Sequence, residues 1–238
     1  MSLRTDLQQY AETSGPDAFS LQNSKLLKVR LDDGAIQAKR GSMVAYQGDV
    51  TFEHAGSGGM SRMIKKAVTG EGADLMKMRG TGEVFLADAA QEVHLVLLEN
   101  DSLTVNGPNL LAFDADIDWD ITRLTGGAAG ALAGGLFNMT LRGSGWVALV
   151  TDGPPILLDV AAAPTFADAQ AAVTWSSGVT AGLRTDVSAK TLIGKSSGES
   201  IQMAFSGEGW VLIQPSEGRV SGIGGGGGGG VLGGLLGG

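Results

Sequence analysis

Apolar residues alternate with variable ones in three copies of one phrase along the chain. Each copy begins with Met, continues with a second apolar residue, carries a Gly-x-Gly pair, and ends with Val and another aliphatic residue. The copies span residues 76–86, 139–149 and 203–213, so their first methionines stand 63 and 64 residues apart. The period of two predicts β-strands, in which the glycines allow a bulge or the close approach of another backbone. We therefore expect one β module, repeated three times.

Residue pairs that tolerate positive φ stand between apolar stretches near each phrase. Such pairs favour tight turns, so each of them predicts a hairpin between the two strands that it separates. One of these hairpins, within residues 28–38, opens the chain without a preceding glycine phrase. The pairs are Asp33-Gly34, Asn100-Asp101, Asp152-Gly153 and Glu217-Gly218.

One aromatic residue follows each complete hairpin at the same place, and each is a predicted core anchor: Phe52, Trp119 and Trp175. The first hairpin lacks its glycine phrase, and the last phrase lacks the rest of its module. We therefore expect the C-terminal strand to pair beside the N-terminal hairpin. That pairing would close the three modules into a pseudo-threefold all-β body without free sheet edges.

The composition divides the chain into three parts. Residues 1–18 form an N-terminal lead, and residues 19–220 form a single composite domain that contains the three repeats. Residues 221–238 form a glycine-rich tail, in which Gly224–Gly230 is an unbroken glycine run. Ordering each glycine costs about 1–2 kcal/mol of backbone entropy with no side chain to recover it, so the tail is predicted to be a flexible tether.

The charges are distributed unevenly. Residues 1–79 carry 11 basic and 9 acidic side chains, whereas residues 80–238 carry 6 and 16, which gives the net charge of −8. Because an acidic surface repels phosphate backbones, nucleic acid is disfavoured as a partner. Cysteine is absent, which excludes disulfides and cysteine nucleophiles. The N-terminus has no apolar run typical of a signal peptide, and no stretch of about 18 apolar residues occurs, so we expect a cytoplasmic protein.

The strongest candidate for an interaction surface lies in residues 60–68. At helical spacing the apolar residues share one face and the basic residues lie together on its flank, which predicts one short amphipathic helix. Such a helix would contact an anionic membrane surface or an acidic partner. The alternative is a helix that caps the open end of the β body, with its lysines only solvated. The candidate residues are Met60, Arg62, Met63, Ile64, Lys65 and Lys66.

Acidic residues and histidines offer weaker candidates. Asp114, Asp116, Asp118 and Asp120 alternate, which predicts four carboxylates on one strand face that could attract a divalent cation. A calcium loop folds its ligands around the ion, so a solvated outer face is the favoured interpretation. The only histidines, His54 and His94, lack a third ligand for a zinc site. The sequence therefore predicts no catalytic residue, no metal site and no cofactor.

Several short motifs are spread over the chain: Gly80–Asp88, Leu103–Gly107, Phe113-Asp114, Asp118–Ile121, Gly134–Asn138 and Gln214–Ser216. Together they resemble the motifs of the altered inheritance of mitochondria protein 24 family. The resemblance covers about residues 20–218 and implies a β-sandwich or short double-stranded β-helix of three repeats, similar to the tryptophan RNA-binding attenuation protein subunit. Mitochondrial members of the family are associated with inner-membrane organisation, whereas bacterial members of this type are largely uncharacterised. The first twenty residues contain one arginine and three acidic residues, which is not typical of a mitochondrial targeting segment.

These observations favour a non-enzymatic interaction or scaffold protein. Its expected partners are proteins or an anionic membrane surface, with a homo-oligomer as a further option, and its expected location is cytoplasmic or peripheral to a membrane. The alternative is a small-ligand or RNA-binding module similar to the tryptophan RNA-binding attenuation protein. RNA binding requires a stripe of Lys and Arg, which the sequence provides only within residues 62–79. A cupin-like metalloenzyme ranks last, because it requires a histidine pair with a carboxylate.

Overall fold

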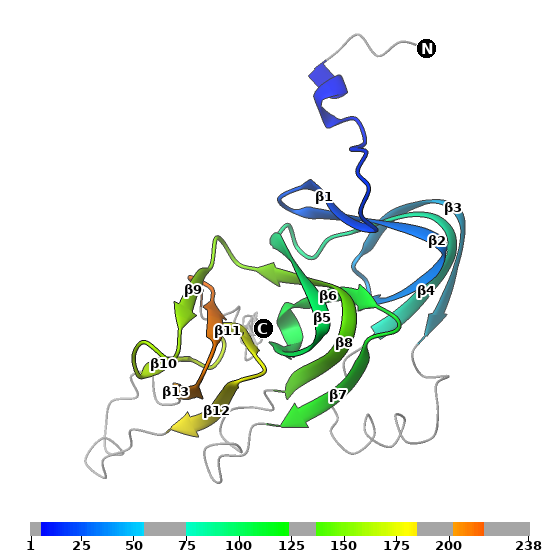
Figure 1. The fold of residues 1–238 in the computed structure, drawn as a ribbon. Helices are drawn as coiled ribbons and strands as arrows, with labels where there is room; N and C mark the ends of the chain where they lie inside the picture. The colour runs from blue at the N-terminus through cyan, green and yellow to red at the C-terminus, as the bar shows by residue number, and fades with distance from the viewer. Residues whose placement is uncertain (1–5, 55–74, 124–136, 185–201, 217–238) are drawn as a thin grey trace, which may run out of the picture.

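The computed structural model describes residues 6–54, 75–123, 137–184 and 202–216, and Figure 1 shows how their strands are arranged. The described elements are β-strands and two short 3-10 helices, so the predicted all-β class is confirmed. Within these residues no helix is both long enough and apolar enough to span a membrane. The elements are η1 (Asp6–Tyr10), β1 (Phe19–Asn23), β2 (Leu26–Lys39), β3 (Met43–His54), β4 (Leu75–Leu86), β5 (Glu92–Asn106), η3 (Gly107–Asn109), β6 (Leu110–Asp114), β7 (Asp118–Arg123), β8 (Phe137–Thr151), β9 (Ile156–Asp159), β10 (Thr165–Asp168), β11 (Ala172–Ser176), β12 (Val179–Arg184), β13 (Gln202–Gly207) and β14 (Trp210–Ile213).

Each glycine phrase lies between two flanking segments in an antiparallel arrangement. β4 lies between β2 and β3, and β8 lies between β5 on one side and β6 and β7 on the other. The third phrase is divided: β13 lies between β10 and β12, and β14 lies between β9 and β11. In all three groups the flanking strands therefore precede the glycine strand in the sequence.

The two ends of the chain do not complete one another, so the expected pairing of the C-terminal strand with the N-terminal hairpin is wrong. Among the described residues, β13 and β14 pair only with β9 to β12, whereas β2 pairs with β1, β4 and β6. The physical reason is the chain order: the last phrase already has its flanking strands before it. The larger sheet runs in the order β3-β4-β2-β6-β8-β5-β11-β14-β9, and the smaller in the order β10-β13-β12. These sheets do not close into a barrel. β3 and β9 end the strand order of the larger one, and β1 and β7 lie off this order, paired with β2 and β8.

Two of the predicted turns are bulges within continuous strands. Asp33-Gly34 lies inside β2, and Asn100-Asp101 lies inside β5. The positive φ is present, at 51° for Asp33 and 56° for Asn100. The register against the neighbouring glycine strand shifts at each site, but pairing continues on both sides of the shift. A long partner strand therefore keeps the chain extended where the local sequence favours a turn.

The described residues form three core clusters, and each phrase contributes most of its buried apolar residues to a different one. Each of the three predicted aromatic anchors belongs to, or packs against, a different cluster, which confirms their place in the core. Phe52 packs against the cluster that contains Met78, Trp119 packs against the cluster of Met139, and Trp175 belongs to the cluster of Met203.

Backbone contact explains the glycines of the first phrase. Gly80 and Gly82 have φ values of 138° and 154°, which L side chains rarely adopt. A Cβ atom on Gly80 would lie 2.0 Å from the carbonyl oxygen of Asp49, and one on Gly82 would lie 2.1 Å from that of Gln47. This is the close approach of another backbone that the sequence predicts. In the second phrase, Gly143 also has a positive φ, of 124°, but no atom lies within 4 Å of the corresponding Cβ position.

We expect Gly80→Ala to destabilise the protein more than Gly143→Ala. Both substitutions place an L residue at positive φ, which costs about 1–3 kcal/mol, but only at Gly80 must a neighbouring backbone also move. Urea denaturation of the two variants, followed by circular dichroism, measures the difference. Equal losses would mean that backbone strain alone requires glycine at these positions.

Candidate functional site

The amphipathic segment predicted as an interaction surface lies outside the described residues. The same holds for the glycine-rich tail of residues 221–238. Both remain predictions. The residues of that surface are Met60, Arg62, Met63, Ile64, Lys65 and Lys66.

The four aspartates do not share one strand face, so that expectation is wrong. β6 ends at Asp114 and β7 begins at Asp118. A turn interrupts the period of two between them, where the backbone N–H of Ile117 donates to the carbonyl oxygen of Asp114 at 3.1 Å. Asp120 accepts a hydrogen bond from the backbone N–H of Ile121 at 2.9 Å. Across the described residues, no group of three His, Asp or Glu side chains could hold a metal ion.

Asp114 is the aspartate whose environment is most unusual. Its Oδ2 accepts a hydrogen bond of 2.6 Å from the backbone N–H of Trp146. A Cβ on Gly145 would lie 2.7 Å from the same oxygen, so the second phrase uses this glycine to admit a side chain. Burial raises the pKa of Asp114; the Trp146 N–H opposes this shift, and the nearby Asp116 adds to it. A half-buried carboxylate therefore carries a penalty for its charge here.

The three groups of strands are connected at the short helix η3, which is the green coil near the centre of Figure 1. Lys39 of β2 bonds to η3, Asn109 of η3 bonds to β8, and Asn106, just before η3, bonds to β11. Gln214, after β14, bonds to Asn109. We call these residues the η3 junction: Lys39, Asn106, Asn109 and Gln214.

Asn109 and Gln214 connect the second group of strands to the third. The amide of Asn109 donates to the carbonyl oxygen of Val150 at 2.8 Å and to Oε1 of Gln214 at 3.2 Å. Oε1 of Gln214 also accepts from the backbone N–H of Asp152 at 3.1 Å, and its amide nitrogen donates to the carbonyl oxygen of Gln170 at 3.1 Å. Both side chains are buried, so each of these bonds replaces a bond to water.

Asn106 and Lys39 provide the other contacts of the η3 junction. The amide of Asn106 donates to the carbonyl oxygen of Ala172 at 3.2 Å and, more weakly, to that of Ala169 at 3.5 Å. Its Oδ1 is buried and meets no donor among the described residues. Lys39 Nζ bonds to the carbonyl oxygen of Pro108 at 3.1 Å and to Asp88 Oδ2 at 2.5 Å. Because Lys39 is partly exposed, this ion pair adds little stability.

His94 lies beside this junction and bonds to Thr151. Thr151 Oγ1 donates to the carbonyl oxygen of Gly153 at 2.7 Å and lies 2.8 Å from Nε2 of His94. Since the hydroxyl proton is used by Gly153, Nε2 of His94 acts as the donor, which assigns the neutral tautomer with a proton on that atom. Burial lowers the pKa of His94, and the charge of Glu92 opposes the shift. The ring is therefore a neutral member of the hydrogen-bond chain.

Sequence reasoning locates only part of the η3 junction. The motifs Leu103–Gly107 and Gln214–Ser216 contain Asn106 and Gln214, but nothing local to Asn109 reveals that its partner lies 105 positions away. The four side chains bond chiefly to backbone groups, so their effect is to orient the strand groups. The Asn-Gly-Pro-Asn run at residues 106–109 is the sequence signal for the position of the η3 junction, because its turn-forming residues end a strand.

We expect Asn109→Ala to destabilise the third group of strands. The substitution leaves the carbonyl oxygen of Val150 and Oε1 of Gln214 without this donor, which costs about 1–3 kcal/mol for buried groups. Compared with the wild type, hydrogen exchange of the β11 and β14 amides should accelerate more than that of the β2 and β4 amides. Asn23→Ala is the matched control: it removes an exposed amide at the end of β1, where Oδ1 accepts from the backbone N–H of Lys25, and should leave the rates of β11 and β14 unchanged. Uniform acceleration over all strands would contradict a role at the junction.

The Asp114 environment predicts a pH dependence. Because burial raises its pKa above the ordinary value in the folded state, the folded protein takes up the proton more readily, and stability is lost as the pH rises from the ordinary pKa through the raised one. Asp114→Asn keeps an acceptor for the Trp146 N–H and removes the charge. The free energy of unfolding of Asp114→Asn minus that of the wild type, measured by urea denaturation, should therefore be larger at pH 7 than at pH 3.5. Asp114→Ala, which leaves the N–H without its acceptor, should be less stable than Asp114→Asn at both pH values.

Comparison with known proteins identifies the family. No protein of curated function matches the chain. The fold is similar to an X-ray crystal structure of a protein from Streptococcus pyogenes, with a TM-score of 0.68 and 22% sequence identity, covering 83% of this chain and 92% of that chain. At this identity the likeness shows the fold alone. The family model described as mitochondrial biogenesis AIM24 matches residues 19–216, and the chain therefore belongs to the AIM24 family.

Proposed function

We propose that this AIM24 family protein is a non-enzymatic interaction protein of the cytoplasm that binds an extended segment of a protein partner along the edge strand β9. The observation that carries this proposal is the exposure of β9. Ile156 and Leu157 are 57% and 59% exposed, although both are large aliphatic residues. Successive residues of a strand point to opposite faces, so both faces of this edge offer apolar surface.

The backbone of β9 supports the same proposal. β9 ends the order of the larger sheet and pairs with β14 on its inner side. The outer side of such a strand is a template for another chain, which supplies main-chain hydrogen bonds and places alternate side chains against the apolar residues. Asp152 and Asp159 stand near the two ends of β9, so the partner segment fits best with basic residues beside its apolar ones.

The other outer strand, β3, is a weaker candidate. Val44 and Tyr46 of β3 are 57% and 47% exposed. The ring of Tyr46, however, packs edge to face against Phe52, with the ring centroids 5.1 Å apart. This aromatic contact already uses part of the apolar surface within the chain. β9 therefore remains the preferred edge.

The repeat is a further part of this proposal. We infer that the three groups of strands are copies of one module, because two flanking segments precede a glycine strand in each of them. All six glycines of the phrases also have positive φ. Contact with an anionic membrane surface through residues 60–68, and binding of a small ligand or RNA, remain hypotheses for which the described residues supply no specific observation.

A differential capture experiment tests the proposed edge. Wild type and the double variant Ile156→Lys/Leu157→Lys are used as baits in the same cell extract, with Leu97→Lys as a matched control on an exposed residue of the inner strand β5. We expect a protein that the wild type and Leu97→Lys retain and the edge variant loses. The purified partner should then show the same difference in affinity. Equal retention by all three baits would exclude β9 as the binding edge.

A further inference from the structure

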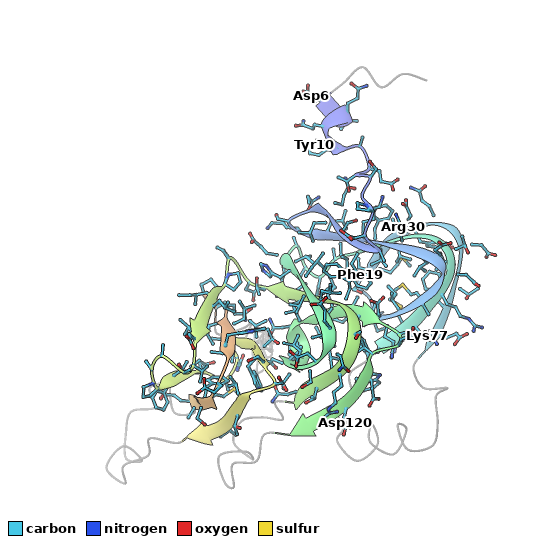
Figure 2. All side chains as sticks on the ribbon, viewed as in Figure 1. Asp6, Tyr10, Phe19, Arg30, Lys77 and Asp120 are labelled. Atoms are coloured by element: carbon cyan, nitrogen blue, oxygen red, sulfur yellow. The ribbon has the colours of Figure 1, made fainter. Side chains whose placement is uncertain are left out.

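The N-terminal segment of residues 6–18 extends away from the strand body. Figure 2 shows Asp6 and Tyr10 beyond the body, with Arg30 and Phe19 at the base of the segment. Every residue from Asp6 to Asp17 is exposed, and Phe19 is the first buried residue. Residues 11–16 of this exposed segment are nevertheless held by hydrogen bonds to side chains of β1 and β2. Exposure alone does not explain why they lie against these strands.

Three side chains of β1 and β2 hold residues 11–16 by their main chain. Gln22 donates to the carbonyl oxygen of Ala11 at 3.0 Å, and its Oε1 accepts from the backbone N–H of Thr13 at 2.9 Å. Lys28 Nζ donates to the carbonyl oxygen of Thr13 at 2.6 Å. The guanidinium of Arg30 donates to the carbonyl oxygens of Gly15 at 3.0 Å and Pro16 at 2.6 Å. We call Gln22, Lys28 and Arg30 the peptide track.

Glu12 is the acidic residue that the peptide track recognises. Its Oε1 lies 2.6 Å from Nζ of Lys28, which also lies 3.0 Å from Oε1 of Glu83. The side chain of Lys28 is only 8% exposed, whereas that of Glu12 is 37% exposed. Hydrogen bonds to Glu83 and Lys28 lower the pKa of Glu12, and the bond to Glu12 raises the pKa of Lys28. A buried ammonium requires such partners, so an uncovered peptide track would attract a carboxylate.

We propose that the peptide track is a docking site for an extended segment of a partner protein that carries a glutamate among small residues, and that residues 11–16 occupy it in cis. The track bonds mainly to backbone carbonyls, which any extended segment offers. Among the side-chain contacts that the track makes with residues 11–16, the pair between Lys28 and Glu12 is the charged one, and it sets the specificity. Because this surface lies on β1 and β2, the proposal does not depend on binding at β9.

Chain connectivity favours a different protein over a second copy as the partner. Asp17 and Ala18 alone connect Pro16 to the buried Phe19, and Arg30 holds both Gly15 and Pro16 on their own body. The backbone N–H of Arg30 also donates to the carbonyl oxygen of Ala18 at 2.8 Å. The N-terminal segment therefore cannot reach the track of another copy without losing these bonds.

Occupation in cis makes the track a regulated site. A segment joined by a short connection has an effective concentration in the millimolar range, so a partner present at lower concentration competes poorly. Displacement or weakening of residues 11–16 would expose Lys28 and raise the affinity for a segment supplied in trans.

The test uses the full chain with Glu12→Lys and a fluorescent peptide of residues 8–17 with the wild-type sequence. Charge reversal places a second ammonium group against Lys28, which opens the track, and fluorescence anisotropy measures binding of the peptide. We expect affinity about tenfold or more above that of the wild-type chain, because the cis competitor is weakened. The same peptide with Glu12→Gln should bind about tenfold more weakly, and adding Lys28→Met to the opened chain should remove the difference between the two peptides.

Asp6→Lys is the matched control, because it makes the same charge change on the same segment away from the track; it should bind the peptide as the wild type does. If Glu12→Lys does not fold, Glu12→Gln carries the same comparison, since it removes the charge and keeps the size. A folded opened chain that binds the peptide no better than wild type overturns the proposal. A wild-type dimer in sedimentation that dissociates on Glu12→Lys overturns it too, because it assigns the track to a second copy.

Discussion

The distance between two backbones is the constraint on which the first group of strands depends. At Gly80 and Gly82 the neighbouring carbonyl oxygens of β3 lie where a Cβ would be, so the two main chains meet without side chains between them. The partner strand β2 accommodates the same region with a bulge at Asp33. A pair of glycines opposite a bulge allows long strands to remain paired through a change of direction. The second group uses the related arrangement of β8 against β5.

The sequence predicts the strands better than it predicts their connections. The three phrases, the aromatic anchors and the all-β class follow from the period of two, which is a local property. Asp33-Gly34 and Asn100-Asp101 are residue pairs that tolerate positive φ. Both turns and bulges use positive φ, so the pairs alone do not distinguish a turn from a bulge. The choice between them depends on whether a long strand lies alongside, and that strand is distant in the sequence. The same reason explains the wrong pairing of the chain ends.

The candidate sites likewise depend on contacts between segments that are distant in the sequence. The η3 junction depends on Asn109 meeting Gln214, and the peptide track depends on Lys28 meeting both Glu12 and Glu83. No periodic pattern contains these pairs, because each joins segments that only the fold brings together. The aspartates from Asp114 to Asp120 have a clear pattern, but a turn breaks their common face. No local signal marks the track, because β2 also carries Arg30, Asp32 and Lys39, and only the fold shows that Lys28 is buried.

The bonds of the η3 junction keep the three strand groups in a fixed orientation, whereas the edge β9 and the peptide track lie at its periphery. The two proposed binding surfaces therefore use residues other than the buried amides of Asn106, Asn109 and Gln214, although the peptide track contains the buried Lys28. We expect substitutions at β9 to change binding and substitutions at the η3 junction to change stability.

The family match begins at Phe19, which is also the first buried residue. The segment that covers Lys28 therefore precedes the part that defines the family. Removing residues 6–16 from this chain would keep every strand of the family match and take the carboxylate of Glu12 away from Lys28, which would then have Glu83 as its charged neighbour. The exposure of this lysine therefore depends on a segment outside the architecture that supports it.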